Sequence, residues 1–313
     1  MKKTVIAFGE VLWDLLPSCT VLGGAPFNFA YRVNSLGDTA LMASRVGRDE
    51  LGSKAREQIV ELGLNVRFIQ WDDDLPTGTV QVSFDEKDSP DYFIVPQVAY
   101  DRIECEDGLL EVASKADCLC FGTLAQRAGR SRETIQRLLQ RATSAVKLLD
   151  INLRKDCYTI EAVTSSLEKA GVLKLNEDEA RQLARMLGLS QRSIPQFCEE
   201  VLDTWSIEQC LVTLGEKGAF AAARNGRRAY VPGYKVRLAD SLGSGDAFTA
   251  GFVHKVLRGE TLAAACEFGN ILGAIVATQT GATAAVHQKD INTFLSRDIE
   301  RIVHPEFEDF MTH

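Results

Sequence analysis

Short, mainly apolar runs alternate with longer amphipathic segments over most of the chain. Such runs are typical of strands that are buried on both faces of a sheet. They cover residues 4–9, 39–44, 117–122, 146–151, 171–176 and 209–215. The longer segments between them repeat apolar residues at helical spacing, as in residues 49–63, 131–144 and 176–188. This alternation predicts an α/β protein with a doubly wound, mostly parallel sheet flanked by helices.

One section departs from the alternation. Residues 77–101 are typical of two strands of alternating polarity around a polar turn. A hairpin does not easily join a parallel core, so we expect a small separate β-sheet that serves as a lid, with another strand from about residues 12–22. We therefore predict a single α/β domain over residues 1–313 with this lid inserted in it. The last residues, 298–313, predict a helix or an ordered tail without an assigned role.

Composition and charge exclude several classes of protein. The chain has 313 residues, of which 45% are hydrophobic and 25% charged, values that are ordinary for a globular protein with a sizeable core. A net charge of −8 argues against nucleic acid as the main partner but allows a local phosphate pocket. The eight cysteines contain no Cys-x-x-Cys pair, so we expect reduced thiols. Without a recognisable signal peptide, membrane span or lipidation motif, we expect a cytoplasmic protein with no membrane partner.

A glycine-rich stretch near the C-terminal end is the main candidate for chemistry. The chain contains no Gly-x-x-x-x-Gly-Lys-[Ser/Thr] motif, so phosphate must be bound by another device. Gly243, Ser244 and Gly245 lead into a helix that we predict from near Asp246 to about Arg258. The unpaired N–H groups of a helix start, together with the helix dipole, form an anion site.

Asp246 has two interpretations in this position. It either caps the helix or complements its dipole, or it acts as a base that takes the proton of an attacking hydroxyl while the amides hold the transferred group. Proximity to a helix N-terminus should lower its pKa. A weak base is still sufficient for phosphoryl transfer, whose loose transition state depends mainly on orientation and charge stabilisation.

Further stretches, in order along nearly the whole chain, resemble the ribokinase-like (PfkB) family of sugar kinases, most closely its bacterial fructokinase-like members. These stretches are FGEVLWDLLP, LGGAPFNFAYRVNSLG, PTGTVQVSFDEKDSPDYFIV, CFGTLAQR, LLDINLRKD, KLNEDE, VTLGEKGAF, DSLGSGDAFTAGF and FGNILGAIVATQTGATAAV. The resemblance implies a ribokinase-like fold, a lid that closes over a sugar, ATP and Mg²⁺ as cofactors, and Asp246 as the catalytic base beside an anion hole formed by residues 243–245.

Sugar contacts are implied near the N-terminus. Asp14, Gly24 and Asn28 match residues that hold sugar hydroxyls in the family. A carboxylate and a carboxamide suit recognition of neighbouring hydroxyls, and a glycine lets the ring approach the backbone. The alternative for Asn28 is a solvent-facing position on a helix begun by Pro26. Arg154 follows a strand end and is either a phosphate or sugar contact or part of a structural salt bridge.

Nucleotide and cation contacts are implied further along the chain. Asn176 and Glu179 match the family's Asn-x-x-Glu motif near the triphosphate, where Glu179 would orient Mg²⁺ through water, although the same spacing also forms a capping box. The other residues implied for ATP are Thr213, Gly215, Gly218, Asn270 and Gly273. A monovalent cation such as K⁺ is implied near Asp240 and Leu242, where LADSLG departs from the VVDTVG that is usual in the family.

These features favour an ATP-dependent kinase that phosphorylates a primary hydroxyl of a small sugar. The GGAPFN and FGTLAQR stretches favour fructose, while ribose, 2-keto-3-deoxygluconate or a nucleoside are alternative acceptors. A non-catalytic sugar or nucleotide sensor on the same fold is the alternative from a different class. A lid of two strands can pair with another lid in a homodimer or stand alone, and the sequence leaves this open.

Overall fold

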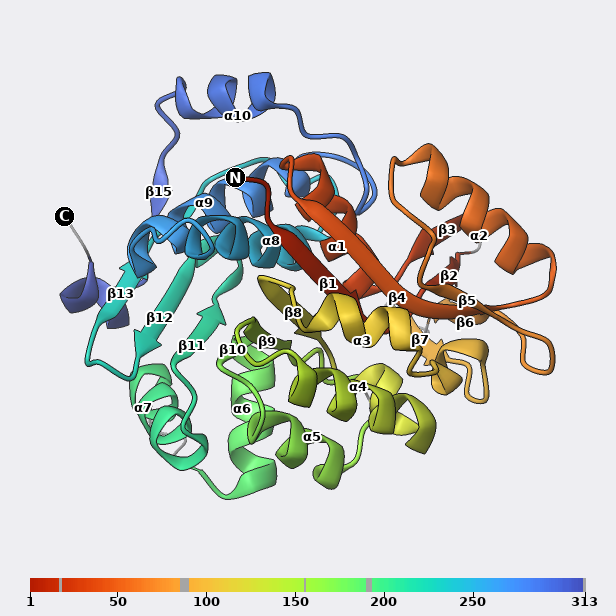
Figure 1. The fold of residues 1–313 in the computed structure, drawn as a ribbon. Coiled ribbons are helices and arrows are strands. Elements are labelled where there is room, and N and C mark those ends of the chain that lie inside the picture. Colours follow the sequence, from red (N-terminus) through yellow and green to blue (C-terminus); the bar gives the residue numbers. More distant parts are fainter. Residues whose placement is uncertain (17–18, 85–89, 155, 190–192, 312–313) are drawn as a thin grey trace.

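The computed structural model describes residues 1–313 except 17–18, 85–89, 155, 190–192 and 312–313. Within these residues the largest sheet has nine strands in the order β13-β12-β11-β10-β9-β8-β1-β4-β5, with helices on both faces (Figure 1). Its strands are β1 (Thr4–Phe8), β4 (Thr39–Gly47), β5 (Ile69–Asp72), β8 (Cys118–Phe121), β9 (Val146–Asp150), β10 (Val172–Asn176), β11 (Gln209–Thr213), β12 (Ala219–Ala223) and β13 (Arg228–Val231). The predicted doubly wound α/β fold is confirmed.

Pairing in this sheet is parallel from β11 to β5 and antiparallel only at β12 and β13. All six predicted strands are present. The sequence analysis did not predict the short edge strand β5, nor β12 and β13, which together contain five alanines and therefore carry a weak strand signal.

Two hydrophobic cores lie on opposite faces of this sheet. One face is covered by α1 (Ala25–Ser35), α2 (Glu50–Glu61), α8 (Ser244–Val256) and α9 (Leu262–Ala277), and the other by α3 (Asp107–Ala113), α4 (Gly129–Arg141), α5 (Ile160–Leu167), α6 (Glu177–Leu187) and α7 (Ile194–Trp205). The remaining helical segments are α10 (Gln288–Leu295) and the 3-10 turns η1 (Ala99–Arg102), η2 (Leu124–Arg127), η3 (Gly215–Lys217) and η4 (Pro305–Phe310). Of the helices in the described residues, none is long and apolar enough to cross a membrane.

Strand β10 illustrates how the two cores are built. Leu173 and Leu175 belong to the core beneath α6 and α7, whereas Val172 belongs to the core beneath α8. Successive side chains of a strand alternate between faces, so Lys174 emerges on the α8 side, at a position that the pattern would fill with an apolar residue.

A separate sheet of four strands lies beside β4 and β5, at the right of Figure 1. It has the order β3-β2-β6-β7, with β2 (Leu12–Leu15), β3 (Thr20–Gly23), β6 (Gly78–Phe84) and β7 (Pro90–Ile94). The predicted small sheet is therefore confirmed, and the expected strand near residues 12–22 is in fact a pair. The predicted polar turn at 85–89 lies outside the described residues.

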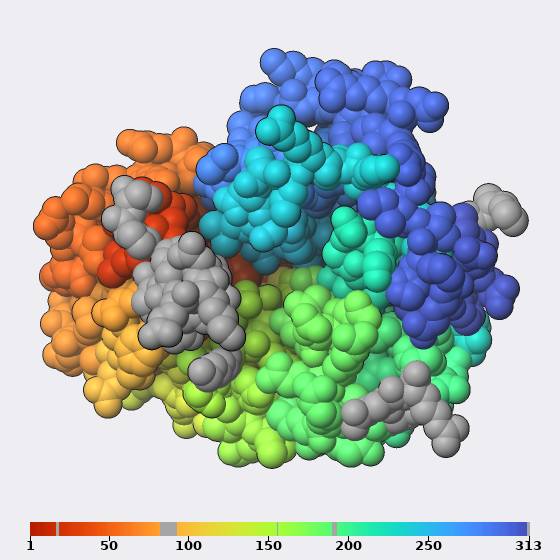
Figure 2. All heavy atoms as spheres, turned by 180° about the vertical axis from the view of Figure 1, so that it is seen from behind, coloured from red at the N-terminus to blue at the C-terminus, as the bar shows by residue number. Residues whose placement is uncertain are grey.

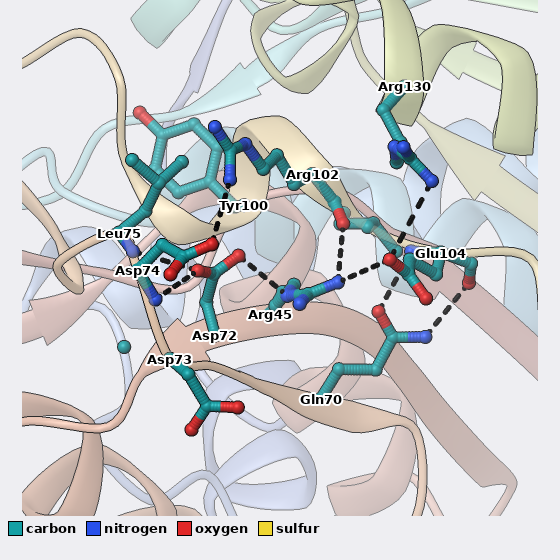
Figure 3. A network of polar contacts seen from close by, with 12 residues as sticks. Arg45, Gln70, Asp72, Asp73, Asp74, Leu75, Tyr100, Arg102, Glu104 and Arg130 are labelled. Atoms are coloured by element: carbon teal, nitrogen blue, oxygen red, sulfur yellow. Dashed lines mark hydrogen bonds and ion pairs between the residues drawn. The ribbon is translucent and has the colours of Figure 1, made fainter.

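Polar contacts fix the point where the chain leaves the large sheet for this smaller one. Arg45 of β4 lies between Asp72, at 2.8 Å, and Glu104, at 3.1 Å (Figure 3). Directly before β6, the hydroxyl and the amide of Thr77 donate hydrogen bonds to the Asp49 carboxylate at 2.7 and 2.8 Å. The base of β6 is thus anchored, while the strand itself extends away from the large sheet.

The C-terminal residues form an ordered tail, as expected. Strand β15 (Arg301–Ile302) pairs with β14 (Gly233–Tyr234), and η4 follows. Phe307 of η4 lies 5.3 Å from the rings of both Phe220 and Tyr230. These residues, dark blue in Figure 2, therefore pack against the strands at the edge of the large sheet.

Candidate active site

A cavity of about 960 Å³ lies at the carboxyl ends of the central strands, bounded by the four-stranded sheet and the start of α8. Open α/β sheets bind ligands at this edge. The predicted site residues that line the cavity are Asp14, Gly24, Asn28, Arg154, Asn176, Thr213, Gly215, Gly218, Leu242, Gly243, Ser244, Gly245, Asp246, Asn270 and Gly273. Glu179 and Asp240 do not line it. The fold thus brings together residues that are distant in the sequence, while their individual roles stay predictions.

One end of the cavity is formed by the four-stranded sheet and by α1. Leu12, Val80 and Ile94 contribute apolar walls beside Asp14, and burial raises the pKa of Asp14 to about 6. Asn28 is only 5% exposed, so the alternative of a solvent-facing side chain is wrong.

Gly24 joins β3 to α1 with a backbone that no other residue would adopt easily. Its φ is +111°, and an added Cβ would lie 2.5 Å from the Glu10 carbonyl oxygen. The sequence analysis explained this glycine by the approach of a sugar. The structure adds a reason within the fold, because the turn itself requires a residue without a side chain.

The predicted anion site lies at the start of α8, on the wall of the cavity. Gly243 is the N-cap residue, with φ +76°, and a Cβ on it would lie 2.5 Å from the Cβ of Ala282. Among the described residues the amides of Gly243 and Gly245 have no acceptor, whereas the amide of Ser244 donates to the Ser241 carbonyl at 3.2 Å. Of the three backbone amides predicted to bind an anion, the two glycine amides are therefore free to donate, and that of Ser244 is already engaged.

Asp246 does not cap this helix. Gly243 occupies the N-cap position, no side chain forms a capping bond there, and the Asp246 carboxylate instead accepts a hydrogen bond from the Asn28 amide at 2.9 Å. Burial and then the charge of Asp150 raise the pKa of Asp246 to about 6. The expectation of a lowered pKa is wrong, because burial and a neighbouring carboxylate outweigh the helix N-terminus and the smaller lowering contributions of Lys174 and Asn28.

Several buried charged residues in or beside the cavity were not singled out by the sequence analysis. Lys174 forms a buried ion pair with Asp150, whose carboxylate also accepts a hydrogen bond from Thr249 of α8. Glu10 also lines the cavity, and burial raises its pKa to about 7. Arg32 of α1 is fully buried and donates to the Ala282 carbonyl at 3.0 Å. The sequence offered one sign of these residues, namely a lysine within the otherwise apolar VLKL run of β10, which indicates a buried charge.

Arg154 stands alone at the rim of the cavity. It is exposed and donates a weak hydrogen bond to Asn152 at 3.4 Å. It forms no ion pair with any residue that the structure describes, so the structural salt bridge is not observed. It lines the same cavity as Glu10, Asp14 and Asp246, and its charge lowers the pKa values of these three carboxyl groups.

The opposite end of the cavity carries the residues predicted for ATP. Asn176 and Glu179 form the capping box of α6, with both reciprocal hydrogen bonds at 2.8 Å. The second oxygen of Glu179 accepts from the Leu153 amide at 3.2 Å. Asn270 donates to the Val231 carbonyl at 3.0 Å and so joins α9 to the edge of the sheet.

The residues predicted for a monovalent cation lie in a loop just before α8. The two carboxylate oxygens of Asp240 accept hydrogen bonds from the amides of Leu242, at 2.9 Å, and Gly281, at 3.0 Å. Asp240 thereby ties this loop to the segment after α9. Within the described part of the chain no three His, Cys, Asp or Glu side chains are clustered in a way that could hold a metal ion.

The comparison with known families agrees with this geometry. Residues 20–289 match the family described as pfkB family carbohydrate kinase. Because the match spans most of the chain, the protein belongs to the PfkB family of carbohydrate kinases, enzymes that transfer a phosphoryl group from ATP to an alcohol group of a sugar.

Individual relatives differ in their substrates. The chain is 27% identical to a fructokinase of Salmonella typhimurium, covering 93% of this chain and 99% of the relative. It is also 27% identical to a 2-dehydro-3-deoxygalactonokinase of Haloferax volcanii, covering 94% and 97%. Among solved structures it resembles a fructokinase of Xylella fastidiosa with bound ATP, with a TM-score of 0.81, 22% identity and coverage of 94% and 98%. It likewise resembles a mutant fructokinase of Vibrio cholerae that binds fructose, ADP and potassium, with a TM-score of 0.78, 24% identity and the same coverage.

Proposed function

We propose that the protein phosphorylates a primary hydroxyl of fructose, with Asp246 as the base that orients the hydroxyl and takes its proton. The sugar would lie between Asp14, Asn28 and the four-stranded sheet, and ATP at the opposite end. The amides of Gly243 and Gly245 would stabilise the charge of the transferred phosphoryl group. Fructose is favoured over ribose, 2-keto-3-deoxygluconate and nucleosides by the GGAPFN and FGTLAQR stretches and by the fructokinases among the relatives.

The observation that carries this proposal is the pairing of Asn28 with Asp246 beside the amides of α8. The amide of Asn28 fixes one carboxylate oxygen, while the buried carbonyl oxygen of Asn28 has no partner among the described residues. A buried acceptor without a donor is costly, and a sugar hydroxyl would supply the donor. With a pKa of about 6, Asp246 is largely ionised at neutral pH and remains basic enough to accept a proton.

Magnesium fits the nucleotide end of the cavity only through water. Both oxygens of Glu179 already accept backbone hydrogen bonds, so this carboxylate suits an ion that keeps part of its hydration shell and is otherwise held by phosphates. Bound Mg²⁺ would neutralise charge on the transferred phosphate. Asp240 and the backbone near Leu242 would hold K⁺. The hydrogen bonds of Asp240 to the amides of Leu242 and Gly281 already join the loop before α8 to the segment after α9.

The four-stranded sheet is the natural lid of this site. Leu12, Val80 and Ile94 project from it into the cavity wall, so its movement would exclude water from the sugar. We assign the lid to residues 12–22 and 77–101 of a single domain that spans residues 1–313. Pairing of two lids would give a homodimer, which sedimentation analysis can test.

A panel of sugars tests the proposed activity. Purified protein with ATP and Mg²⁺ should release ADP with fructose faster than with ribose, 2-keto-3-deoxygluconate or nucleosides. The Asp246→Asn variant should lose turnover by orders of magnitude and keep sugar and nucleotide binding, measured by calorimetry. Sugar binding without ADP release in the wild type would favour the sensor, and near-normal turnover of Asp246→Asn would remove the base assignment.

A further inference from the structure

A buried ion pair lies behind the cavity, between the large sheet and α8. Asp150 and Lys174 are cross-strand neighbours in the register of β9 and β10, so their side chains emerge on the same face. The Lys174 ammonium lies 3.0 Å from one oxygen of Asp150, and the hydroxyl of Thr249 donates to the other at 2.8 Å. Lys174 is 4% exposed, although the strand position would otherwise take an apolar residue.

This pair contacts the helix turn that carries Asp246. The Lys174 ammonium lies 3.4 Å from the point where a Cβ of Gly245 would be, and Lys174 also lines the cavity. The Thr249 hydroxyl that reaches Asp150 is 3.0 Å from the Gly245 carbonyl oxygen as well. The ion pair and the first turn of α8 are therefore in direct contact.

Stability alone does not explain a buried ion pair at this position. Removing two charges from water costs several kcal/mol per ion, and well-packed apolar side chains often replace such pairs without loss of stability. We propose that Lys174 and Asp150 are positioning residues for phosphoryl transfer, which set the charge and the orientation of Asp246 through opposing effects. The proposal rests on the proposed function, because it takes Asp246 to be the base.

The electrostatics of the site supports this role. Burial and the Asp150 charge raise the pKa of Asp246, whereas the Lys174 charge lowers it. Lys174 in turn interacts with Glu179. The other titratable groups that act on Asp246 or are acted on by it are Glu10 after β1, Arg32 of α1, Cys120 of β8 and Arg154 after β9. All of these remain when the pair is altered, so variants of the pair isolate its contribution.

Two charge-changing variants should move the pH profile in opposite directions. The measured quantity is the acid limb, the pH at which kcat/KM for the sugar falls to half its plateau. Asp150→Asn keeps the shape and removes the negative charge, so the acid limb should move down by about one pH unit, which raises the relative rate at pH 5 roughly fivefold. Adding Lys174→Met to Asp150→Asn should move it back up by a similar amount, because the lowering charge of Lys174 is then lost and the Asp150 carboxylate is no longer there to share the proton.

Matched controls separate charge from structure. Thr249→Val removes a neutral contact to Asp150 and should leave the acid limb in place, whatever its effect on kcat. Lys174→Arg keeps the charge and should leave the pH of the acid limb unchanged, whereas Lys174→Gln alone should move the acid limb to higher pH. These two variants replace Asp150→Asn in the test if that variant does not fold. Since ATP titrates identically in every variant, differences between profiles belong to the protein. Unmoved acid limbs in the charge variants, even with lower kcat, would show a merely structural ion pair and overturn the proposal.

A second measurement does not depend on turnover. The carboxyl carbon of Asp246 can be titrated by NMR in the full chain, with its resonance assigned by its loss in Asp246→Asn. The pKa of Asp246 measured in this way should fall in Asp150→Asn and rise again in the double variant. If no sugar is phosphorylated by the wild type, the proposed function fails, but the titration still decides whether Lys174 and Asp150 control this carboxylate.

Discussion

Removing the amide of Asn28 is the sharpest single test of the proposed site. Asn28 donates a 2.9 Å hydrogen bond to Asp246 and is 5% exposed, so Asn28→Ala leaves the carboxylate without its only side-chain donor among the described residues. A hydrogen bond to a charged group contributes about 1.5–3 kcal/mol, which corresponds to a loss of roughly 10- to 150-fold in kcat/KM.

The pH dependence gives this prediction a sign as well as a size. The hydrogen bond from Asn28 lowers the pKa of Asp246, so its loss should raise that pKa above about 6 and move the acid limb to higher pH. The assay is kcat/KM for the sugar from ADP release between pH 5 and 9. Asn34→Ala is the control, since Asn34 lies on the same helix and its side-chain amide donates to the Gly63 carbonyl at the surface, away from the cavity. A change in kcat/KM of less than twofold, or an unmoved acid limb, would refute the assigned contact.

Further predictions concern the nucleotide turn, the buried carboxyl and the metal. Gly218→Ala places a Cβ 2.0 Å from the Val231 carbonyl at φ +92° and should cost about 2–4 kcal/mol in unfolding free energy and weaken ATP binding in calorimetry. Gly226→Ala, with φ +82° and open space around it, should cost only about 1–2 kcal/mol. The folded pKa of Glu10 is about 7 against an ordinary 4.5, so the folded state binds its proton more tightly, and this contribution to stability is present below pH 4.5 and is lost as the pH rises through 7. At pH 8 the unfolding free energy of Glu10→Gln, measured by denaturant titration, should therefore exceed that of the wild type by about 3 kcal/mol. At pH 4 the two proteins should differ little. Chelation of Mg²⁺ should abolish ADP release, and added Mg²⁺ should restore it; turnover that persists in chelator would contradict the metal assignment.

Local sequence patterns were sufficient for most of the fold. Strand and helix periodicity predicts elements from neighbours only a few residues apart, which is why β1, β10 and α6 match their predicted segments. The weak signal of β12 and β13 shows the limit, because the pairing of β12 with β11 and of β13 with β12, rather than their composition, makes them strands. The sequence also placed the start of α8 close to its observed position, at Ser244, and this helix start lines the cavity.

The sequence by itself determined the order of strands and helices, and with it most of the predicted residues that line the cavity, but not Glu10 or Lys174. The tertiary structure decided how they act on one another. Asn28 and Asp246 are 218 positions apart, so their hydrogen bond exists only because α1 and α8 cover the same face. The raised pKa of Asp246 likewise depends on burial and on Asp150 of a distant strand, whereas the sequence showed only the helix start that favours ionisation. Periodicity is a local property, but the charge state of a carboxyl depends on everything that is packed around it.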